Sequence, residues 1–261
     1  FSIDVPGTEL AADPDVTVDG SVATMEAAGN PGSATDDHLY GVDTTAPVPT
    51  IVIDDITPDN IINAAEAGTD IPVSGTVGGE FNDGDIVTLI VNGKAFTGPV
   101  NAAGVFSIDV PGTDLSADSD ITVDGSVATV DAAGNPGSAT DDHLYGVDTT
   151  APIPTIVIDD ITLDNIVNAA EAGTDIPVTG TVGGEFNNGD TVTLIVNGTD
   201  YTGTVDAAGV FSIDVPGAEL ATDPDITVDG SVSTTDAAGN PGSATDDHLY
   251  GVDTAPPIPT I

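Results

Sequence analysis

Cysteine and tryptophan are absent from this chain of 261 residues, and Lys94 is its single basic residue. Without cysteine, neither disulfides nor thiolate metal sites can hold the fold. The disulfide packed on tryptophan that marks antibody domains is excluded as well. Aromatic residues make up only 4% of the chain, so any core must be built from small aliphatic side chains. No apolar stretch approaches the ~18 residues of a membrane span.

The scarcity of basic residues leaves a large excess of acid. There are 44 Asp and Glu residues and a formal net charge of −43. With no basic patch to meet phosphate, binding to nucleic acid or direct contact with an anionic membrane is excluded. Self-repulsion opposes a compact state unless a cation binds, and high net charge is also typical of disorder. The 39% apolar content, with Val and Ile in alternating runs, favours folding.

One segment of this sequence, AAGNPGSATDDHLYGVDT, occurs three times, each copy 105 residues after the last. A period this long predicts a complete domain rather than a solenoid unit of ~20–50 residues. We predict complete repeats at 49–153 and 154–258, the C-terminal half of a repeat at 1–48, and the start of a following one at 259–261. Residues 1–48 alone cannot close a sandwich, so either the sequence starts within a domain or the missing strands come from elsewhere.

The middle copy shows the strand pattern. Strands are predicted at 50–56, 71–77, 85–92, 94–100, 105–110, 121–130 and 137–147. Asn92-Gly93 indicates a hairpin, and a helical turn with Asp59 as N-cap and Gly68 as its stop follows the first strand. We predict a loop at 111–120. This pattern favours an all-β fold of tandem immunoglobulin-like β-sandwiches, with seven strands each and short Pro-containing linkers. A small barrel is the rival.

Oxygen-bearing side chains gather where the predicted loops lie. Successive strands run in opposite directions. This places the loops 57–69, 92–93 and 111–120, together with the exit linker at 147–152, at the lower end of a sandwich. The loops 78–84, 101–104 and 131–136 lie at the upper end, next to the preceding copy. The lower-end candidates are Asp54, Asp55, Asp59, Asn60, Asn63, Glu66 and Asp118, and in the next copy Asp159, Asp160, Asp164, Asn165, Asn168 and Glu171. The linker and upper-end candidates are Asp43, Asp148, Asp253, Asp131, Asn135, Glu185, Asp190, Asp236 and Asn240.

These residues are predicted to bind Ca²⁺, which prefers carboxylate, amide and carbonyl oxygens. Each of them alone could equally be a solvated acid or a turn former. As a set, so many acids without basic partners need a cation. The chain has neither an EF-hand loop nor the nonapeptide runs of a calcium β-roll.

Other chemistry has little support in the sequence. His38, His143 and His248 share one repeat position and are expected on a strand surface, with a transition-metal or proton-transfer role as the alternative. Tyr40, Tyr145 and Tyr250 are expected to pack at a sheet edge. No Gly-x-Ser-x-Gly elbow is present, and the abundant carboxylates select no glycosidase pair. We therefore predict that the chain is not an enzyme.

The repeated motifs resemble those of a known family. Val-Asp-Thr-Thr-Ala-Pro-x-Pro-Thr-Ile, Asp-Asn-Ile-x-Asn-Ala-Ala-Glu-Ala, Gly-Val-Phe-Ser-Ile-Asp-Val-Pro-Gly and Asp-Ala-Ala-Gly-Asn together are similar to the bacterial Ig-like extender repeats of giant RTX adhesins. The resemblance covers the whole chain. It implies a secreted fibre on the surface of a Gram-negative bacterium, anchored through other regions, with Ca²⁺ within and between domains. It points to Asp54, Asp59, Asn63, Glu66, Asp131, Asn135 and Asp148 as ligands.

The predicted function is therefore structural. Calcium would rigidify tandem domains that contact neighbouring repeats of the same chain and project distal ligand-binding domains, whose target the sequence does not reveal. The alternative is an adhesion module that binds carbohydrate or protein through its loops. That alternative predicts aromatic platforms or loops that differ between copies, and the sequence has neither.

Overall fold

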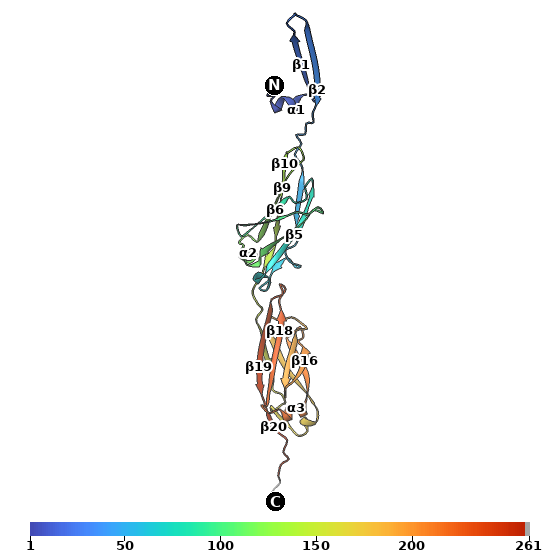
Figure 1. The fold of residues 1–261 in the computed structure, drawn as a ribbon. Coiled ribbons are helices and arrows are strands. Elements are labelled where there is room, and N and C mark those ends of the chain that lie inside the picture. The colour runs from blue at the N-terminus through green and yellow to red at the C-terminus, as the bar shows by residue number, and fades with distance from the viewer. Residues whose placement is uncertain (259–261) are drawn as a thin grey trace. The chain divides into compact units, whose positions relative to one another are not determined.

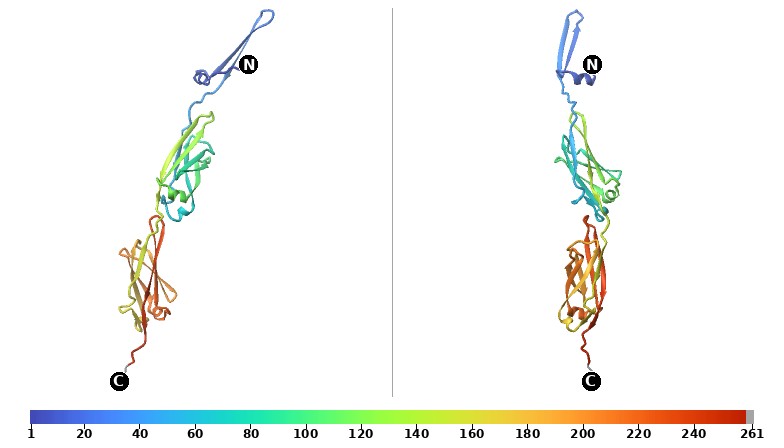
Figure 2. Two further views of the ribbon diagram at one scale, coloured as in Figure 1. Left: turned by 90° about the vertical axis from the view of Figure 1, so that its left-hand side faces the viewer. Right: turned by 180° about the vertical axis from the view of Figure 1, so that it is seen from behind.

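The computed structural model describes residues 1–258, so the predicted start of a further repeat at 259–261 lies outside the described residues. Figures 1 and 2 show the chain as a series of β-rich segments. It divides into two compact units. The first contains Phe1–Asp54, Val73–Ile108 and Thr122–His143, and the second contains Asp55–Pro72, Asp109–Ile121 and Leu144–Ile261. The middle copy of the repeat contributes to both units.

The third copy forms two antiparallel sheets. The three-stranded sheet has the order β12 (Pro154–Ile158), β14 (Asp175–Gly184), β17 (Val210–Pro216). The four-stranded sheet has the order β16 (Thr199–Thr204), β15 (Thr191–Val196), β18 (Thr227–Thr235), β19 (Pro241–Leu249). Two separate sheets confirm the predicted immunoglobulin-like sandwich, and the rival barrel is wrong.

Alternation along these strands supplies the core. In β15, Val192, Leu194 and Val196 are buried while the residues between them are more exposed, as the two-residue period of a strand requires. Phe211 from the other sheet is 1% exposed and belongs to the same cluster. The core is aliphatic with few aromatic side chains, as the composition predicts.

The middle copy has the same strand orders. One sheet is β3 (Pro49–Ile53), β5 (Asp70–Gly79), β8 (Val105–Pro111), and the other is β10 (Pro136–Leu144), β9 (Thr122–Val130), β6 (Ile86–Val91), β7 (Lys94–Pro99). All seven predicted strands are therefore present. The predicted hairpin is also confirmed, since Asn92 and Gly93 both have positive φ between β6 and β7.

Short elements complete each copy at its lower end. The parallel pairs are β4 (Ile61–Ile62) with β11 (Gly146–Val147), and β13 (Ile166–Asn168) with β20 (Gly251–Asp253). The short helices are η1 (Glu66–Gly68), η2 (Glu171–Gly173), α2 (Gly112–Ala117) and α3 (Gly217–Thr222). The predicted loop at 111–120 thus contains a helix. Its six residues are too few for a helical pattern to be recognised in the sequence.

The tyrosines that follow the last long strand are part of the interior. Tyr145 and Tyr250 are each 3% exposed. The Tyr145 hydroxyl donates to the carbonyl of Leu115 at 2.7 Å, and Tyr250 donates to Leu220 at 2.8 Å. The predicted sheet-edge position is therefore wrong for both. Each hydroxyl thus ties the end of the last long strand to a short helix 30 residues earlier, and we call this the buried tyrosine contact.

The first copy consists of α1 (Gly7–Ala12) and a hairpin of β1 (Thr17–Met25) and β2 (Pro31–Leu39). Val18 and Val22 are 43% and 61% exposed, whereas their counterparts Val123 and Val127 are 0% and 1% exposed. Positions that form core in a complete copy are thus on the surface here. No helix in residues 1–258 is long and apolar enough to cross a membrane.

Candidate metal centres at the loop ends

A reciprocal pair of hydrogen bonds organises the lower turn of the middle copy. The Asn63 Oδ1 accepts from the backbone N–H of Glu66 at 3.0 Å, and the Glu66 Oε2 accepts from the N–H of Asn63 at 3.0 Å. This is a capping box around η1, and Asn168 and Glu171 repeat it at η2. The predicted N-cap, Asp59, is therefore wrong, because Asn63 caps this turn. The predicted stop is confirmed, since η1 ends at Gly68.

Asp59 and Asn60 belong to a separate turn that precedes β4. The Asp59 Oδ1 accepts from the Thr57 hydroxyl at 2.8 Å, and this bond and the one from the Ile61 N–H lower the pKa of Asp59. Asn60 has a φ of 58°, and its side chain joins the N–H of Ile56 to the carbonyl of Leu144. Asp164 and Asn165 make the equivalent bonds. Each of these candidate ligands therefore forms hydrogen bonds that stabilise this turn.

The remaining lower-end acids lie beside strands and helices. The Asp54 Oδ2 accepts from the hydroxyl of Ser74, and the Asp159 Oδ2 accepts from Thr179. Asp160 and the imidazole of His248 are 3.6 Å apart. Asp55 also has an interaction partner. These acids are therefore held individually rather than pointing into one common centre.

Asp118 and its counterpart Asp223 lie next to the buried tyrosine contact, with 9% and 7% of their surface exposed. Burial, then a hydrogen bond and charge repulsion from the Asp225 carboxyl, raise the pKa of Asp223. Two acids that compete for a proton in this way are a place where a cation would relieve repulsion.

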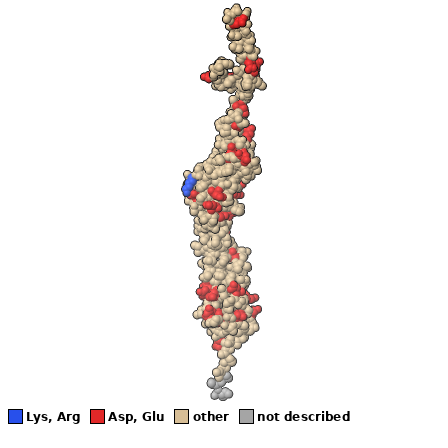
Figure 3. All heavy atoms as spheres, viewed as in Figure 1, with Lys and Arg blue, Asp and Glu red and all other residues tan. Residues whose placement is uncertain are grey.

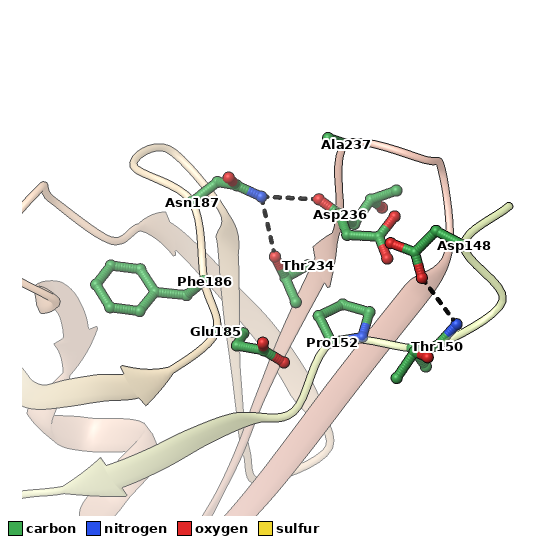
Figure 4. Close-up of a pocket in the computed structure, with 11 residues that line it drawn as sticks. Asp148, Thr150, Pro152, Glu185, Phe186, Asn187, Thr234, Asp236 and Ala237 are labelled. Carbon is green, nitrogen blue, oxygen red and sulfur yellow. Dashed lines mark hydrogen bonds between the residues drawn. The ribbon is translucent and has the colours of Figure 1, made fainter. Parts of the chain in front are cut away.

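A shallow pocket of about 450 Å³ lies at the upper end of the third copy (Figure 4). Three carboxylates from three segments line it: Asp148 from the linker, Glu185 after β14 and Asp236 after β18. In Figure 4 the carboxylates of Asp148 and Asp236 face each other. The Glu185 Oε2 accepts from the N–H of Ile153 at 2.9 Å. Three of the predicted ligands thus line one pocket.

An equivalent pocket of about 420 Å³ occurs in the middle copy. Its carboxylates are Asp43, Glu80 and Asp131, each 105 residues before its counterpart. Glu80 was not among the predicted ligands, although the repeat offset from Glu185 was the signal that could have found it. The recurrence shows that the pocket belongs to the repeat.

The acid that begins each upper loop is tightly held. The Asp236 Oδ1 accepts from the N–H groups of Ala238 and Asn240 at 3.0 and 2.8 Å. The Asn240 side chain, followed by backbone groups of the loop, lowers the pKa of Asp236, and Asn135 does the same for Asp131. Asp190 accepts from the N–H of Asn187 at 2.6 Å. Asp131 and Asp236 are therefore ionised at neutral pH.

The linker acids all make the same local bond. Asp43, Asp148 and Asp253 each accept from the N–H two residues later, at 3.0, 3.0 and 3.1 Å. Such Asx-turns fix the direction in which the linker leaves the preceding strand.

The donors at both ends are carboxylate, amide and main-chain oxygens. Hard cations such as Ca²⁺ prefer this set, and soft metals do not. Figure 3 shows acidic side chains distributed along the visible face. Within residues 1–258, however, no group of three or more His, Cys, Asp or Glu side chains is placed to hold a metal ion. The donor chemistry fits calcium, and the complete ligand set stays a prediction.

Neither a protein-family model nor a curated protein matches the chain. Two solved structures are similar over 98% of it. One, described as a Ca²⁺-stabilised adhesin that helps an Antarctic bacterium reach out and bind ice, is 43% identical with a TM-score of 0.84, and the chain covers 60% of its length. The other, from work on host cell-surface retention of a 1.5-MDa bacterial ice-binding adhesin, is 40% identical with a TM-score of 0.78 and is 80% covered.

Proposed function

This chain belongs to the family of large bacterial ice-binding adhesins with tandem β-sandwich repeats, and we propose that it is a calcium-rigidified extender segment of such an adhesin. The observation that carries the proposal is the repeated upper-end pocket, in which a linker acid is joined by two loop acids. A cation held there would tie the linker to the copy that follows it.

The proposed ligands are the residues of these pockets. In the third copy they are Asp148, Glu185 and Asp236, and in the middle copy Asp43, Glu80 and Asp131. Bound Ca²⁺ would neutralise carboxylates that otherwise repel in a chain of net charge −43. Asp118 and Asp223, which lie beside the buried tyrosine contact, are proposed for a second class of site.

Binding of this kind would contribute substantially to stability. Extracellular modules bind Ca²⁺ with dissociation constants of ~10⁻⁴–10⁻³ M, so saturation is expected outside a cell and not in cytosol. A ligand at ~100 times its dissociation constant stabilises the folded state by about 2.7 kcal/mol per site. Two or three such sites in a copy would match the ~5–15 kcal/mol stability of a typical domain.

The proposal is tested by small-angle scattering and thermal unfolding of the 261-residue chain. Both are measured at ~10 mM Ca²⁺, above the expected dissociation constants, and with a chelator. Calcium should increase the maximum dimension and raise the melting temperature. Magnesium is the control, because it demands octahedral geometry at shorter distances and should act more weakly. Equal dimensions and equal melting temperatures with calcium and chelator would contradict the proposal.

Membership of this family also supports a proposal for the location and the partners of the chain. We infer that the chain acts outside the cell, on the surface of a Gram-negative bacterium, and that it performs no catalysis. Its proposed partners are neighbouring repeats, with the distal target borne by other domains. Binding of carbohydrate or protein through the loops remains the alternative, and a glycan array probed with this chain would reveal it.

A further inference from the structure

We infer that the upper loop of each copy, from Asp236 to Pro241 in the third, is a latch that docks on the lower turn of the preceding copy without a metal. The inference deepens the proposed extender function and rests on it for its biological meaning. Its evidence is a set of hydrogen bonds around Asn240 in the second compact unit.

Asn240 joins three segments. Its Nδ2 donates to the Asp236 carboxylate at 2.9 Å and to the linker carbonyl of Asp148 at 2.8 Å. Its Oδ1 accepts from the backbone N–H of Ala64 at 2.8 Å. Ala64 lies in the lower turn of the middle copy, so one carboxamide binds its own loop, the linker and the preceding copy. Asn240 is 1% exposed, and a buried, fully bonded amide contributes more than an exposed one.

The same chain contains an internal comparison. Asn135, the counterpart of Asn240, bonds to the Asp131 carboxylate at 2.8 Å and to the Asp43 carbonyl at 3.1 Å. Residues 1–48 align with 106–153 and contain no counterpart of Ala64. Within residues 1–258 the two loops therefore differ in the contact with a preceding copy.

The loop of Asn240 is also more buried than the loop of Asn135. Asn135 is half-buried and Ala133 is exposed, whereas Asn240 and Ala238 are 1% and 3% exposed. A Cβ at Gly239 would meet the Asn63 side chain at 3.4 Å, while one at Gly134 would meet nothing within 4 Å. The loop is already folded in both copies, because its internal bonds are the same. It is thus preformed and is covered where a complete copy precedes it.

The partner that this loop fits is the lower turn of another repeat. That turn presents the Ala64 N–H because the Asn63–Glu66 capping box holds its backbone. The Asn168–Glu171 box gives the third copy the same turn. A following repeat with the same loop would find an equivalent donor at Ala169, so the latch can recur at each junction of an array.

The test uses the absence of cysteine from the chain. Ser107→Cys and Ser212→Cys, at exposed and equivalent positions, carry spin labels whose distance distribution is measured by pulsed electron resonance. The variant is Asn240→Ala and its matched control is Asn135→Ala, which removes the same loop and linker bonds. With chelator present, Asn240→Ala should lose a narrow distance component that Asn135→Ala keeps.

A second pair of variants approaches the contact from the other side. Ala64→Pro removes the donor N–H, and Ala169→Pro makes the same change in the third copy. Circular dichroism melts check that each variant folds. Loss of the narrow component in Ala64→Pro but not in Ala169→Pro supports the latch. Equal distributions in the Asn240→Ala and Asn135→Ala proteins overturn it. If the wild-type distance distribution were the same with calcium and with chelator, the calcium-dependent extender would be contradicted and the latch would not.

Discussion

Single side chains in this protein are fixed mainly by hydrogen bonds that lie within a few residues of one another. Asp59, Asn63, Asp148 and Asp236 all accept backbone N–H groups of their own turns. All four residues therefore act as turn formers, the alternative to metal binding that the sequence left open for each of them. It does not exclude metal binding, because a carboxylate that accepts hydrogen bonds on one side can still offer lone pairs on the other.

The two buried tyrosine contacts predict a specific response to alkaline pH. Burial, then the nearby acids Asp118 and Asp223, raise the pKa of Tyr145 and of Tyr250. Their contribution to stability is complete below the unfolded-state pKa of ~10 and is lost as the pH rises above it, because the unfolded chain releases these protons more readily. We expect Tyr145 and Tyr250 to ionise last, together with unfolding. Absorbance at 295 nm measures this.

The control for this titration is the variant Tyr145→Phe, Tyr250→Phe, which retains Tyr40 and Tyr201. The late phase should disappear from the absorbance of this protein. A late phase of unchanged amplitude would show that other tyrosines produce it.

Strands and short helices were predictable to different degrees. All seven long strands follow from two-residue alternation and from turn residues such as Asn92-Gly93. The helix α2 was missed, because a six-residue segment shows less than two helical turns. The pairs β4–β11 and β13–β20 were missed as well. Their two or three residues are strands only because the chain returns beside them at the end of the copy.

Gly180 in strand β14 lies where the neighbouring strands of its own sheet, β12 and β17, leave no room for a side chain. A Cβ at Gly180 would lie 2.3 Å from the Val157 carbonyl oxygen and 2.4 Å from the Phe211 ring. Gly180→Ala should therefore destabilise the copy by about 1–3 kcal/mol through overpacking. Denaturant unfolding of the chain measures the loss.

The matched change is Gly173→Ala in η2, where an added Cβ would meet nothing within 4 Å. Surface changes of this kind usually alter stability by less than ~0.5 kcal/mol. If both variants unfolded at the same denaturant concentration, the close approach at Gly180 would be contradicted.

At the scale of the whole molecule, charge is the dominant variable. The acids are spread over all three copies, so repulsion acts throughout the chain rather than at one tail. Composition alone shows this property, and it predicts a need for cations. It could not predict that linker and loop acids share a pocket, because Asp148 and Asp236 are distant in sequence and meet only in the folded chain.

Repulsion of this kind predicts a salt dependence that requires no specific ion. The screening length falls from ~30 Å at 0.01 M to ~10 Å at 0.1 M salt. With chelator present, the melting temperature should rise over this range, as calorimetry or circular dichroism can measure. NaCl and KCl should act equally, because screening depends on ionic strength. A flat or falling melting temperature would mean that repulsion is not limiting.

The sequence by itself determined the array, its period, its β-sandwich class and the positions of its acidic loops. These features depend on local patterns, namely repeated motifs, alternation and turn residues, and local patterns survive without knowledge of the fold. Only the tertiary structure decided which distant groups meet. Tyr145 reaches Leu115 because β10 returns beside the end of α2. Asn240 reaches Ala64, 176 residues away, because the chain places the loop of one copy on the turn of another.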